Sequence, residues 1–266
     1  MVDPGLPTID LLATAFANVS RRQVVDHVFR ALTIGRGGWI VTPNLDYLRR
    51  CTQERDFGAL VSRANLVVAD GAPLVWAARL QGTPLVERVA GSDLVWLVAE
   101  RAAREGRSLY LLGGNPGAAE GARDQLLARW PGLRVCGVSS PRVAEVPTPS
   151  QVDELREKLS SAGADIFYVA FGAPKQERWV EALHAHFPGT WWIGVGVSLS
   201  FMSGEIRRAP VWMQRAGLEW LHRLAQEPTR LARRYLLHDV PFAGRLLAHA
   251  ALRRLRGAPE PAHITR

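Results

Sequence analysis

The sequence predicts an α/β body, built on a mainly parallel sheet with helices on both faces, followed by a helical C-terminal appendage. Short apolar runs of strand type alternate with stretches of helical periodicity, which is the pattern of repeated βαβ units. Turn residues end several of these runs, such as Gly172 after the run 166–171. Beyond residue 205 the composition becomes basic and rich in arginine. We therefore expect a body over 1–205 and an appendage over 206–266.

The individual elements follow from periodicity and from start and stop residues. The first segment, 8–18, suits a short strand or hairpin. Strands are expected at 39–41, 66–69, 108–112, 133–138, 166–171 and 190–195. Helices are expected from Ser20 to about 32, from about 45 to 64, and at 73–80, 93–105, 118–130, 152–161 with Ser150 as cap, 175–183 with Pro174 in its first turn, and 211–226.

Composition excludes several classes of protein. The chain has 266 residues, 47% of them hydrophobic, and a mean hydropathy of −0.03, which suits a folded core rather than disorder. Cys51 and Cys136 stand alone, so neither a disulfide framework nor a zinc site is indicated and a reducing cytosol is expected. We expect no signal peptide, and no run reaches the roughly 18 apolar residues of a membrane span.

The charge is concentrated at the C-terminal end. Residues 207–266 carry 12 arginines and 4 acids, a net charge of +8, which equals the formal charge of the whole chain. Residues 1–206 are therefore neutral. Such asymmetry predicts an anionic partner for the appendage: phosphates, nucleic acid or an acidic membrane surface.

Polar residues follow three of the expected strands. Thr42 and Asn44 follow the first, Asp70 the second, and Gln176 with Glu177 begins the helix after 166–171. Parallel strands would bring these groups to one edge of the sheet, where ligands bind in open α/β folds. Asp70 in a partly desolvated place could act as a general base. A helix N-cap is an equally ordinary role for an Asp there, and the sequence leaves both interpretations open.

A glycine-rich turn follows the strand 108–112 and precedes a helix. Its residues Gly113, Gly114 and Asn115 could present backbone N–H groups to a phosphate. The turn is neither a Walker A loop nor a full G-x-G-x-x-G, so the indication is weak. No cluster of His, Cys, Asp and Glu has metal-ligand spacing, and no metal is expected.

Arginines in the appendage could bind a diphosphate. On a continuous helix Arg223, Arg230 and Arg233 would share one face, although Pro228 interrupts that helix. Farther on, 242–255 has an apolar stripe beside a basic one. That pattern fits an interfacial helix on anionic lipid and equally a helix packed on the body with a solvated basic face.

Taken together, these motifs resemble the WecG/TagA/CpsF family of bacterial glycosyltransferases, in order along most of the chain. They are Thr42-Pro-Asn44, Ala69-Asp70-Gly71, Arg88 with Gly91-Ser-Asp93-Leu94, Gly113-Gly-Asn-Pro-Gly117, Gly172-Ala-Pro-Lys-Gln176-Glu177, Gly194-Val-Gly196, Arg207-Arg-Ala-Pro210, and Leu218-Glu-Trp-Leu-His-Arg223 through Glu227-Pro228 to Arg230 and Arg233.

The resemblance implies inverting transfer of a sugar, typically of the N-acetylmannosamine type, from a UDP-sugar to a polyprenyl-diphosphate-linked sugar of a surface polymer. No metal or other cofactor is implied. By analogy Asp70 is the general base. Thr42, Asn44 and Gln176 position the sugar and the base, with Arg88 nearby. The appendage closes the site, and its Arg223, Arg230 and Arg233 bind the diphosphate.

The same resemblance implies a cytoplasmic protein that docks peripherally on the inner face of the membrane through the appendage, and self-association through the body. One departure is Ser200, where family members usually carry an acid in a Phe-Asp-Phe run, which puts the donor sugar in question. A non-catalytic protein that binds nucleotide-sugar or lipid diphosphate is the main alternative. Nucleic-acid binding is disfavoured, because the appendage lacks interleaved aromatic residues.

Overall fold

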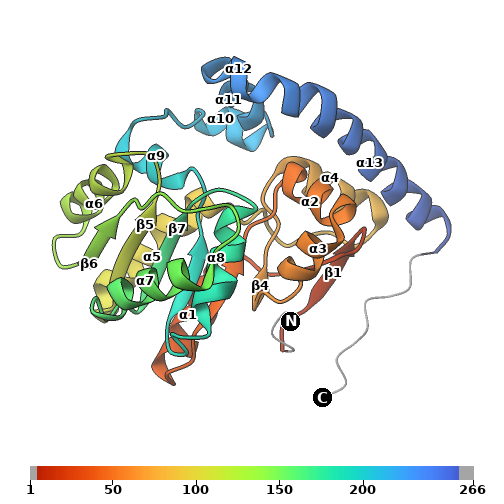
Figure 1. Ribbon diagram of the computed structural model, residues 1–266. Coiled ribbons are helices and arrows are strands. Elements are labelled where there is room, and N and C mark those ends of the chain that lie inside the picture. Colours follow the sequence, from red (N-terminus) through yellow and green to blue (C-terminus); the bar gives the residue numbers. More distant parts are fainter. Residues whose placement is uncertain (1–4, 258–266) are drawn as a thin grey trace. The chain divides into compact units, whose positions relative to one another are not determined.

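The computed structural model describes residues 5–257 and divides into two compact units (Figure 1). Unit 1 combines the chain up to Ser20 with Pro43–Ala90 and with the chain from Arg208 onward, and unit 2 comprises Arg21–Thr42 and Gly91–Arg207. The arginine-rich segment therefore belongs to the same compact unit as residues from the N-terminal third of the chain.

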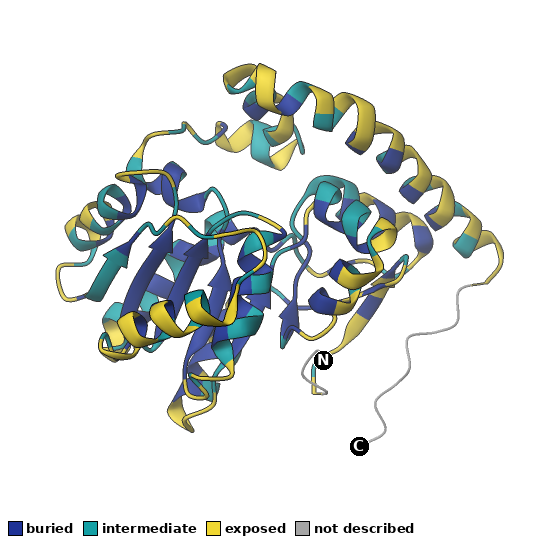
Figure 2. Ribbon diagram, in the orientation of Figure 1, coloured by how far each residue is buried: buried dark blue, intermediate teal, exposed yellow. Residues whose placement is uncertain are grey.

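Unit 2 is built on five parallel strands. They run in the order β3-β8-β7-β5-β6, and every adjacent pair is parallel. Their bounds are Gly38–Val41 for β3, Ser108–Gly113 for β5, Arg134–Ser139 for β6, Ile166–Ala170 for β7 and Trp191–Gly194 for β8. All except the edge strand β6 are buried along their whole length (Figure 2), as their unbroken apolar sequences predict.

Helices cover both faces of this sheet. Helices α7 (Pro149–Ser160) and α8 (Lys175–His184) lie in front of it in Figure 1, and α5 (Gly91–Glu105) lies behind it. The remaining helices of unit 2 are α1 (Arg21–Thr33), α6 (Ala118–Arg129) and α9 (Ser198–Ser203). The chain reverses its direction across the sheet after β6. With crossovers of one hand, such a reversal places the connecting helices on both faces. The predicted α/β class, with a mainly parallel sheet between helices, is confirmed.

Aromatic side chains fill the core of unit 2. The rings of Phe167 and Trp192 stack at 4.2 Å between centroids on the neighbouring strands β7 and β8. The Tyr168 hydroxyl donates to the carbonyl of Val95 on α5 at 2.8 Å, so this buried phenol keeps a hydrogen bond. Such packing fixes the strands and, with them, the loops at their carboxyl ends.

Unit 1 begins with an antiparallel hairpin and ends with a series of helices. The hairpin is β1 (Thr8–Leu11) with β2 (Thr14–Ala17). The central elements are α2 (Leu45–Gln53), α3 (Arg55–Val61), β4 (Leu66–Val67) and α4 (Ala72–Gln81), and the C-terminal ones are α10 (Val211–Arg215), α11 (Glu219–Gln226), α12 (Pro228–Ala232), the π-helix η1 (Arg233–Asp239) and α13 (Val240–Leu255).

Helix α13 packs against α4 within unit 1. It buries Phe242, Leu246 and Ala250, a stripe at helical spacing. Its basic residues Arg245, His249 and Arg254 are exposed, and Arg253 is half-buried. Of the two interpretations that the sequence left open for 242–255, the packed helix is therefore the one seen. No helix between residues 5 and 257 combines the length and the apolar character that a bilayer crossing needs.

Several predicted strands and helices end or divide at residues other than the expected ones. The strand expected over 190–195 stops at Gly194, since Gly196 has a φ of +52° and α9 begins two residues later. The helix expected over 211–226 is two helices, because Gly217 adopts a φ of +74° between them. The helix expected up to 64 divides at Glu54, whose extended backbone separates α2 from α3.

Two predicted helix starts also differ. Thr148, and not Ser150, caps α7, and it forms a reciprocal capping box with Gln151. Pro174 is the N-cap of α8 rather than a residue of its first turn, and it follows a cis peptide bond. Both shifts are of one or two residues, and the elements themselves are the predicted ones.

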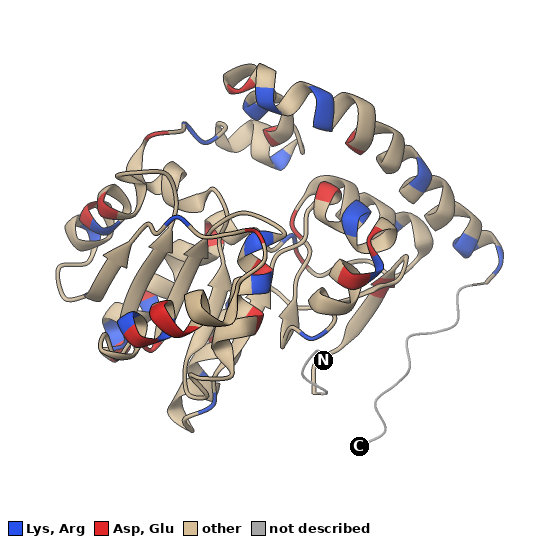
Figure 3. Ribbon diagram, viewed as in Figure 1, with Lys and Arg blue, Asp and Glu red and all other residues tan. Residues whose placement is uncertain are grey.

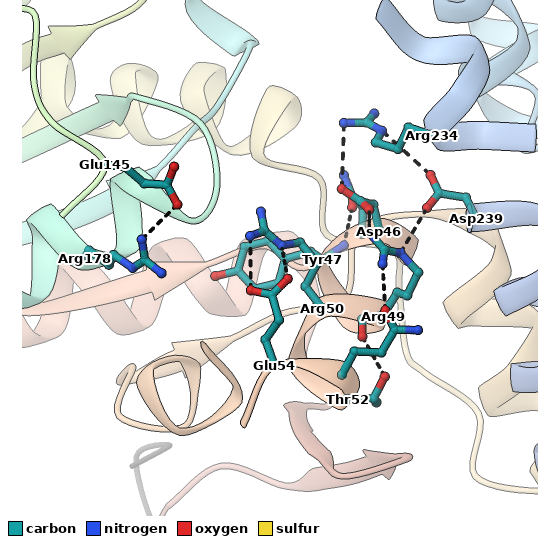
Figure 4. Close-up of polar contacts among 12 residues, drawn as sticks. Asp46, Tyr47, Arg49, Arg50, Thr52, Glu54, Glu145, Arg178, Arg234 and Asp239 are labelled. Carbon is teal, nitrogen blue, oxygen red and sulfur yellow. Dashed lines mark hydrogen bonds and ion pairs between the residues drawn. The ribbon is translucent and has the colours of Figure 1, made fainter. Parts of the chain in front are cut away.

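A cluster of four charges joins η1 to α2 (Figure 4). The Asp46 carboxylate accepts from Arg49 at 2.6 Å and lies 3.8 Å from Arg234. Asp239, which is 7% exposed, lies 3.8 Å from both of these arginines. Burial, followed by the negative charge of Asp46, raises the pKa of Asp239 to about 7, although the two arginines oppose the shift.

We predict that Asp239→Asn removes part of the pH dependence of stability. The folded protein holds the Asp239 proton up to about pH 7, whereas an unfolded Asp releases it near pH 4. The stability that this proton contributes is complete below about pH 4 and is lost as the pH rises to about 7. The unfolding free energy of D239N, measured with urea from pH 4.5 to 7.5, should therefore rise relative to that of the unchanged protein, by at most about 1.4 kcal/mol per pH unit.

The matched control for this series is Asp153→Asn on the exposed surface of α7. It removes a carboxylate from the exposed surface and serves as the reference for D239N at each of these pH values. A D239N protein whose difference from the unchanged protein does not vary with pH would contradict the assigned titration.

Candidate functional site

The carboxyl edge of the sheet in unit 2 gathers two of the predicted site residues. Thr42 follows β3, and Gln176 lies in the first turn of α8, which follows β7. Two glycines permit close approach here. A Cβ on Gly91 would lie 3.2 Å from Thr42 Oγ1, and one on Gly194 would lie 2.8 Å from Gln176 Nε2. A side chain at position 194 would therefore displace Gln176, and one at position 91 would be in tight contact with Thr42.

Gln176 is buried, and its amide is held on both sides. Its Nε2 donates to Glu177 Oε1 at 2.5 Å, and its Oε1 accepts from the N–H of Gly196 at 3.3 Å. The second contact ties the start of α8 to the loop after β8. The amide orientation is thereby fixed by neighbouring groups of the chain itself.

Glu177 is a residue whose burial the sequence did not reveal. It is 1% exposed, although it stands between polar neighbours at the start of a helix, where a solvated carboxylate is the ordinary expectation. Its proximity to Gln176 gives it a role in holding that amide. An acid in the first turn of a helix after a buried strand was the only signal available.

The backbone of the glycine-rich turn requires glycine at positions 113 and 114 for its conformation and packing. Gly113 and Gly114 have φ values of +96° and +88°, and a Cβ on Gly113 would lie 2.8 Å from the ring of Phe171. The N–H of Gly114 donates to the carbonyl of Ala170 at 2.9 Å, and the Asn115 amide donates to Glu205 at 2.5 Å. Of the backbone donors that the sequence offered to a phosphate, the N–H of Gly114 is thus engaged within the chain.

In unit 1, Asp70 is not a helix cap. Gly71 is the N-cap of α4, with a φ of +121°, and no side chain caps that helix. The N–H of Asp70 donates to the carbonyl of Pro43 at 2.9 Å, which places the segment of Asn44 beside it. Asn44 itself caps α2 through Oδ1, which accepts from the N–H of Tyr47 at 3.1 Å. Of the two roles that the sequence left open for Asp70, the helix N-cap is therefore excluded.

Arg88 joins Asp70 to the C-terminal segment within unit 1. Its Nη1 lies 3.8 Å from Asp70 Oδ1 and donates to Glu219 Oε2 at 3.1 Å. The other oxygen of Glu219 accepts from Arg208 Nε at 3.1 Å. The result is a row of alternating charges, Asp70–Arg88–Glu219–Arg208. Sequence reasoning placed Asp70 and Arg88 in the site but missed Glu219 and Arg208, although both lie in the quoted motifs.

The three arginines proposed for a diphosphate are divided between exposed and buried positions. Arg223 on α11 is 8% exposed and donates to Glu227 Oε2 at 2.8 Å, and Arg230 on α12 donates to the same oxygen. Arg233 begins η1 and is exposed. Burial alone would raise the pKa of Glu227, but its hydrogen bonds from Arg230 and Arg223 and their charges hold that pKa below its usual value.

Glu227 thus keeps two arginines together despite the break before Pro228 that the sequence indicated. Further basic residues lie along η1 and α13 (Figure 3). Among residues 5–257, no group of three or more His, Cys, Asp or Glu side chains could hold a metal ion. The expected meeting of Asp70 with Thr42 and Gln176 stays a prediction, since these residues belong to different units.

Comparison with protein families gives a match over nearly the whole chain. A family model described as "Glycosyl transferase WecG/TagA/CpsF family" matches residues 9–256. The matched range contains every residue named above as part of a candidate site.

We predict that Gly194→Ala displaces the Gln176 amide. The added Cβ would lie 2.8 Å from Nε2 and 3.5 Å from the carbonyl of Ile40, so the buried side chain must shift. The unfolding free energy, measured with urea, should fall by about 1–3 kcal/mol. Gly244→Ala is the control, because it lies inside α13 with open space around it and should stabilise by roughly 0.5–1 kcal/mol. Equal effects of the two substitutions would refute the close approach.

Proposed function

Since the chain belongs to the WecG/TagA/CpsF family of glycosyltransferases, we propose that it transfers a sugar from a UDP-sugar to a polyprenyl-diphosphate-linked sugar. The sugar is of the N-acetylmannosamine type or a related one, and transfer proceeds with inversion and without a metal. The observation that supports this proposal most is Asp70, a carboxylate without a capping role that faces Arg88.

In the proposed reaction Asp70 is the general base. As its carboxylate takes the proton of the acceptor hydroxyl, the hydroxyl oxygen attacks the anomeric carbon of the donor. The bond from that carbon to the diphosphate breaks, and its electron pair leaves with UDP. Attack from the face opposite the leaving group inverts the configuration. A partly exposed carboxylate, with 27% of its side-chain surface accessible, can reach a substrate hydroxyl.

Arginines of the appendage would stabilise the leaving diphosphate. Arg223 and Arg230 already share the carboxylate of Glu227, so their guanidinium groups are held close together in a geometry suited to an anion. Arg233 is exposed on the next turn. Charge that develops on UDP in the transition state would be met by groups that need little rearrangement.

Donor recognition is assigned by resemblance to Thr42, Asn44 and Gln176. Ser200, in place of the usual acid of the family, is 4% exposed on α9. A contact that an acid would make to sugar or uridine is therefore replaced by a small hydroxyl residue. The donor is expected to differ accordingly.

We further propose that the appendage docks on an anionic membrane surface from the cytoplasmic side. Segment 211–240 exposes large apolar side chains, among them Trp212, Leu236 and Leu237, each with more than half of its surface accessible. Arginines such as Arg215 and Arg233 lie between them. Apolar residues interleaved with basic ones suit the headgroup region of a bilayer. Self-association of the protein remains part of the proposal.

We predict that Asp70→Asn abolishes transfer and preserves donor binding. The unchanged protein is screened with a panel of UDP-sugars and a short-chain lipid-diphosphate-linked N-acetylglucosamine acceptor, and UDP release is recorded. With the active donor, D70N should lose about 10²–10⁴-fold in rate, the usual contribution of a general base. Calorimetry should find its affinity for the donor within about two-fold of the unchanged protein.

The exposed Asp153→Asn on α7 is the control and should keep full activity. If the unchanged protein binds UDP-sugars but releases UDP with none of them, the alternative of a non-catalytic binding protein replaces the enzyme. High affinity for duplex DNA that falls steeply with salt would favour a nucleic-acid partner instead.

A second prediction concerns the apolar side chains of segment 211–240. Trp212→Ser combined with Leu237→Ser should weaken binding to phosphatidylglycerol vesicles by about ten-fold or more, since each buried large side chain contributes roughly 1.5–3 kcal/mol. Point substitutions are preferable to truncation, because α13 contributes Phe242 and Leu246 to the core. Val146→Ser, at a site 63% exposed in unit 2, is the control. If the double variant binds the vesicles as tightly as the control variant does, the membrane proposal is contradicted.

A further inference from the structure

Helices α4 and α13, which pack against each other within unit 1, form an open groove on its surface (Figure 1). The groove has a volume of about 400 Å³ and is lined by Trp76, Arg79 and Leu80 of α4 and by Arg254 of α13. Sites for small ligands have volumes of about 300–1,000 Å³, so the groove is large enough for one.

The residues that α4 contributes lie on one face of the helix. Trp76 is three residues before Arg79 and four before Leu80, which is the spacing of neighbours on a helix surface. Trp76 and Leu80 are 47% and 40% exposed, and Arg79 is exposed as well. This face of α4 therefore presents two large apolar side chains and a cation to the groove.

The two arginines lie toward the same end of the groove. Arg79 is in the last turn of α4, which ends at Gly82 with a φ of +90°. Arg254 Nη1 would lie 3.5 Å from a Cβ on Gly82, so this guanidinium reaches the carboxyl end of α4 from the neighbouring helix. The negative end of the helix dipole stabilises a cation in that place.

Neither helix supplies an acid to balance these cations. The sequences of α4 and α13 contain no Asp or Glu, although α13 carries Arg245, Arg253 and Arg254. Among residues 5–257, neither Arg79 nor Arg254 forms an ion pair, in contrast to Arg223 and its carboxylate partner Glu227 on α11 and the chain after it. The groove thus has a positive end whose complement is an anion from outside the described chain.

The other end of the groove is apolar. A Cβ on Gly217 would lie 3.0 Å from the ring of Trp76, so Trp76 adjoins the turn between α10 and α11. These two helices expose Trp212 and Leu221. From its arginines to Trp76, the groove changes from cationic to apolar over about one turn of α4. A phosphate group followed by a hydrocarbon chain has the same order.

Hydrogen bonds to the hairpin fix the two helices beside the groove. The carbonyl of Asp10 on β1 accepts from Gln81 Nε2 at 2.8 Å and from Arg253 Nη1 at 3.4 Å. Gln81 is the last residue of α4 and is buried, and Arg253 precedes the groove residue Arg254 on α13. One backbone atom therefore connects the ends of both helices, which favours a groove of constant width.

We propose that this groove binds one anionic phospholipid of the bilayer, with its phosphate at Arg79 and Arg254 and the first carbons of an acyl chain against Trp76 and Leu80. The open groove holds the headgroup and the start of a chain, and the rest of the chain stays in the bilayer. The inference deepens the proposed membrane docking and rests on it for the source of the lipid. It does not rest on sugar transfer.

The test uses dihexanoylphosphatidylglycerol below its critical micelle concentration, so that single lipid molecules and not a surface are offered to the full chain. Calorimetry should find one saturable site per protein molecule. The chain has nine tryptophans, and the indole N–H signal of Trp76 is identified by its loss in Trp76→Phe. That signal should shift as the site fills. No saturable binding, or binding that leaves the Trp76 signal in place, would overturn the inference.

Two variants test the residues of the groove. Arg79→Gln combined with Arg254→Gln should weaken binding by about ten-fold or more, the effect of losing hydrogen bonds to charged groups. Leu80→Glu, which places a like charge in the lining, should weaken it by a similar factor. Circular dichroism checks that both remain folded. Arg22→Gln combined with Arg142→Gln, two exposed arginines of unit 2, is the matched control. Equal affinity of the control and of both groove variants would contradict the site.

Other ligands decide which molecule the groove recognises. Dihexanoylphosphatidylcholine, which has the same chains and no net charge, should bind at least about ten-fold more weakly, because it lacks the net charge that the arginines attract. Glycerol phosphate, which has no chain, should also bind more weakly. Equal affinity for either would reduce the groove to an apolar surface or to a site for free phosphate. Tighter binding of farnesyl phosphate would assign it to the isoprenoid acceptor and overturn the proposal.

The groove and the membrane surface of segment 211–240 are separated by the variant W212S/L237S. It should bind the monomeric lipid as the unchanged protein does, even though its affinity for vesicles falls. Loss of both would place the lipid on segment 211–240 and overturn the groove. If the unchanged protein binds the monomeric lipid but no vesicle, the membrane proposal fails, and with it the bilayer as the source of the lipid, while the anion-selective site in the groove stands.

Discussion

Each of the three carboxylates between residues 208 and 257 lies between two arginines. Glu219 contacts Arg88 and Arg208, Glu227 contacts Arg223 and Arg230, and Asp239 lies near Arg49 and Arg234. Guanidinium groups cannot be packed together without such partners, because their mutual repulsion and their desolvation oppose it. The arginine-rich helices of unit 1 depend on this pairing. Two of the three acids also connect the C-terminal segment to residues before position 91, so these pairs join parts of unit 1 that are distant in sequence.

This arrangement changes what the net charge of the appendage means. The sequence shows an excess of +8 over 207–266, which suggests a freely available basic surface. The structure instead engages Arg208 and Arg223 with acids, while Arg233 and the basic face of α13 remain exposed. An anionic surface would meet the exposed group first. The engaged arginines are better suited to one specific anion whose oxygens can replace a carboxylate.

Sequence reasoning succeeded where information is local and failed where it is not. The parallel strands follow from apolar runs such as Ile166–Ala170, and α1 and α5 follow from their apolar periodicity. Asp70 could not be separated from a helix cap, because the two roles need the same residue type at the same place, and only the cap at Gly71 decides between them. The burial of Glu177 and the pairing of Glu219 with Arg88, 131 residues apart, depend on tertiary contacts that leave no periodic signal.

The two candidate sites hold their polar groups by different means, and this bears on their proposed roles. In unit 2, Gln176 is fixed by glycines at close approach and by hydrogen bonds within a buried sheet edge, so its position is set by packing. In unit 1, Arg88 and the buried Arg223 are held by Glu219 and Glu227, whose carboxylates are partly exposed and can be replaced by another anion. A rigid amide is suited to reading the shape of a sugar. Arginines already paired with carboxylates are suited to receiving a diphosphate, because the incoming phosphate oxygens take over hydrogen bonds that the carboxylate gives up.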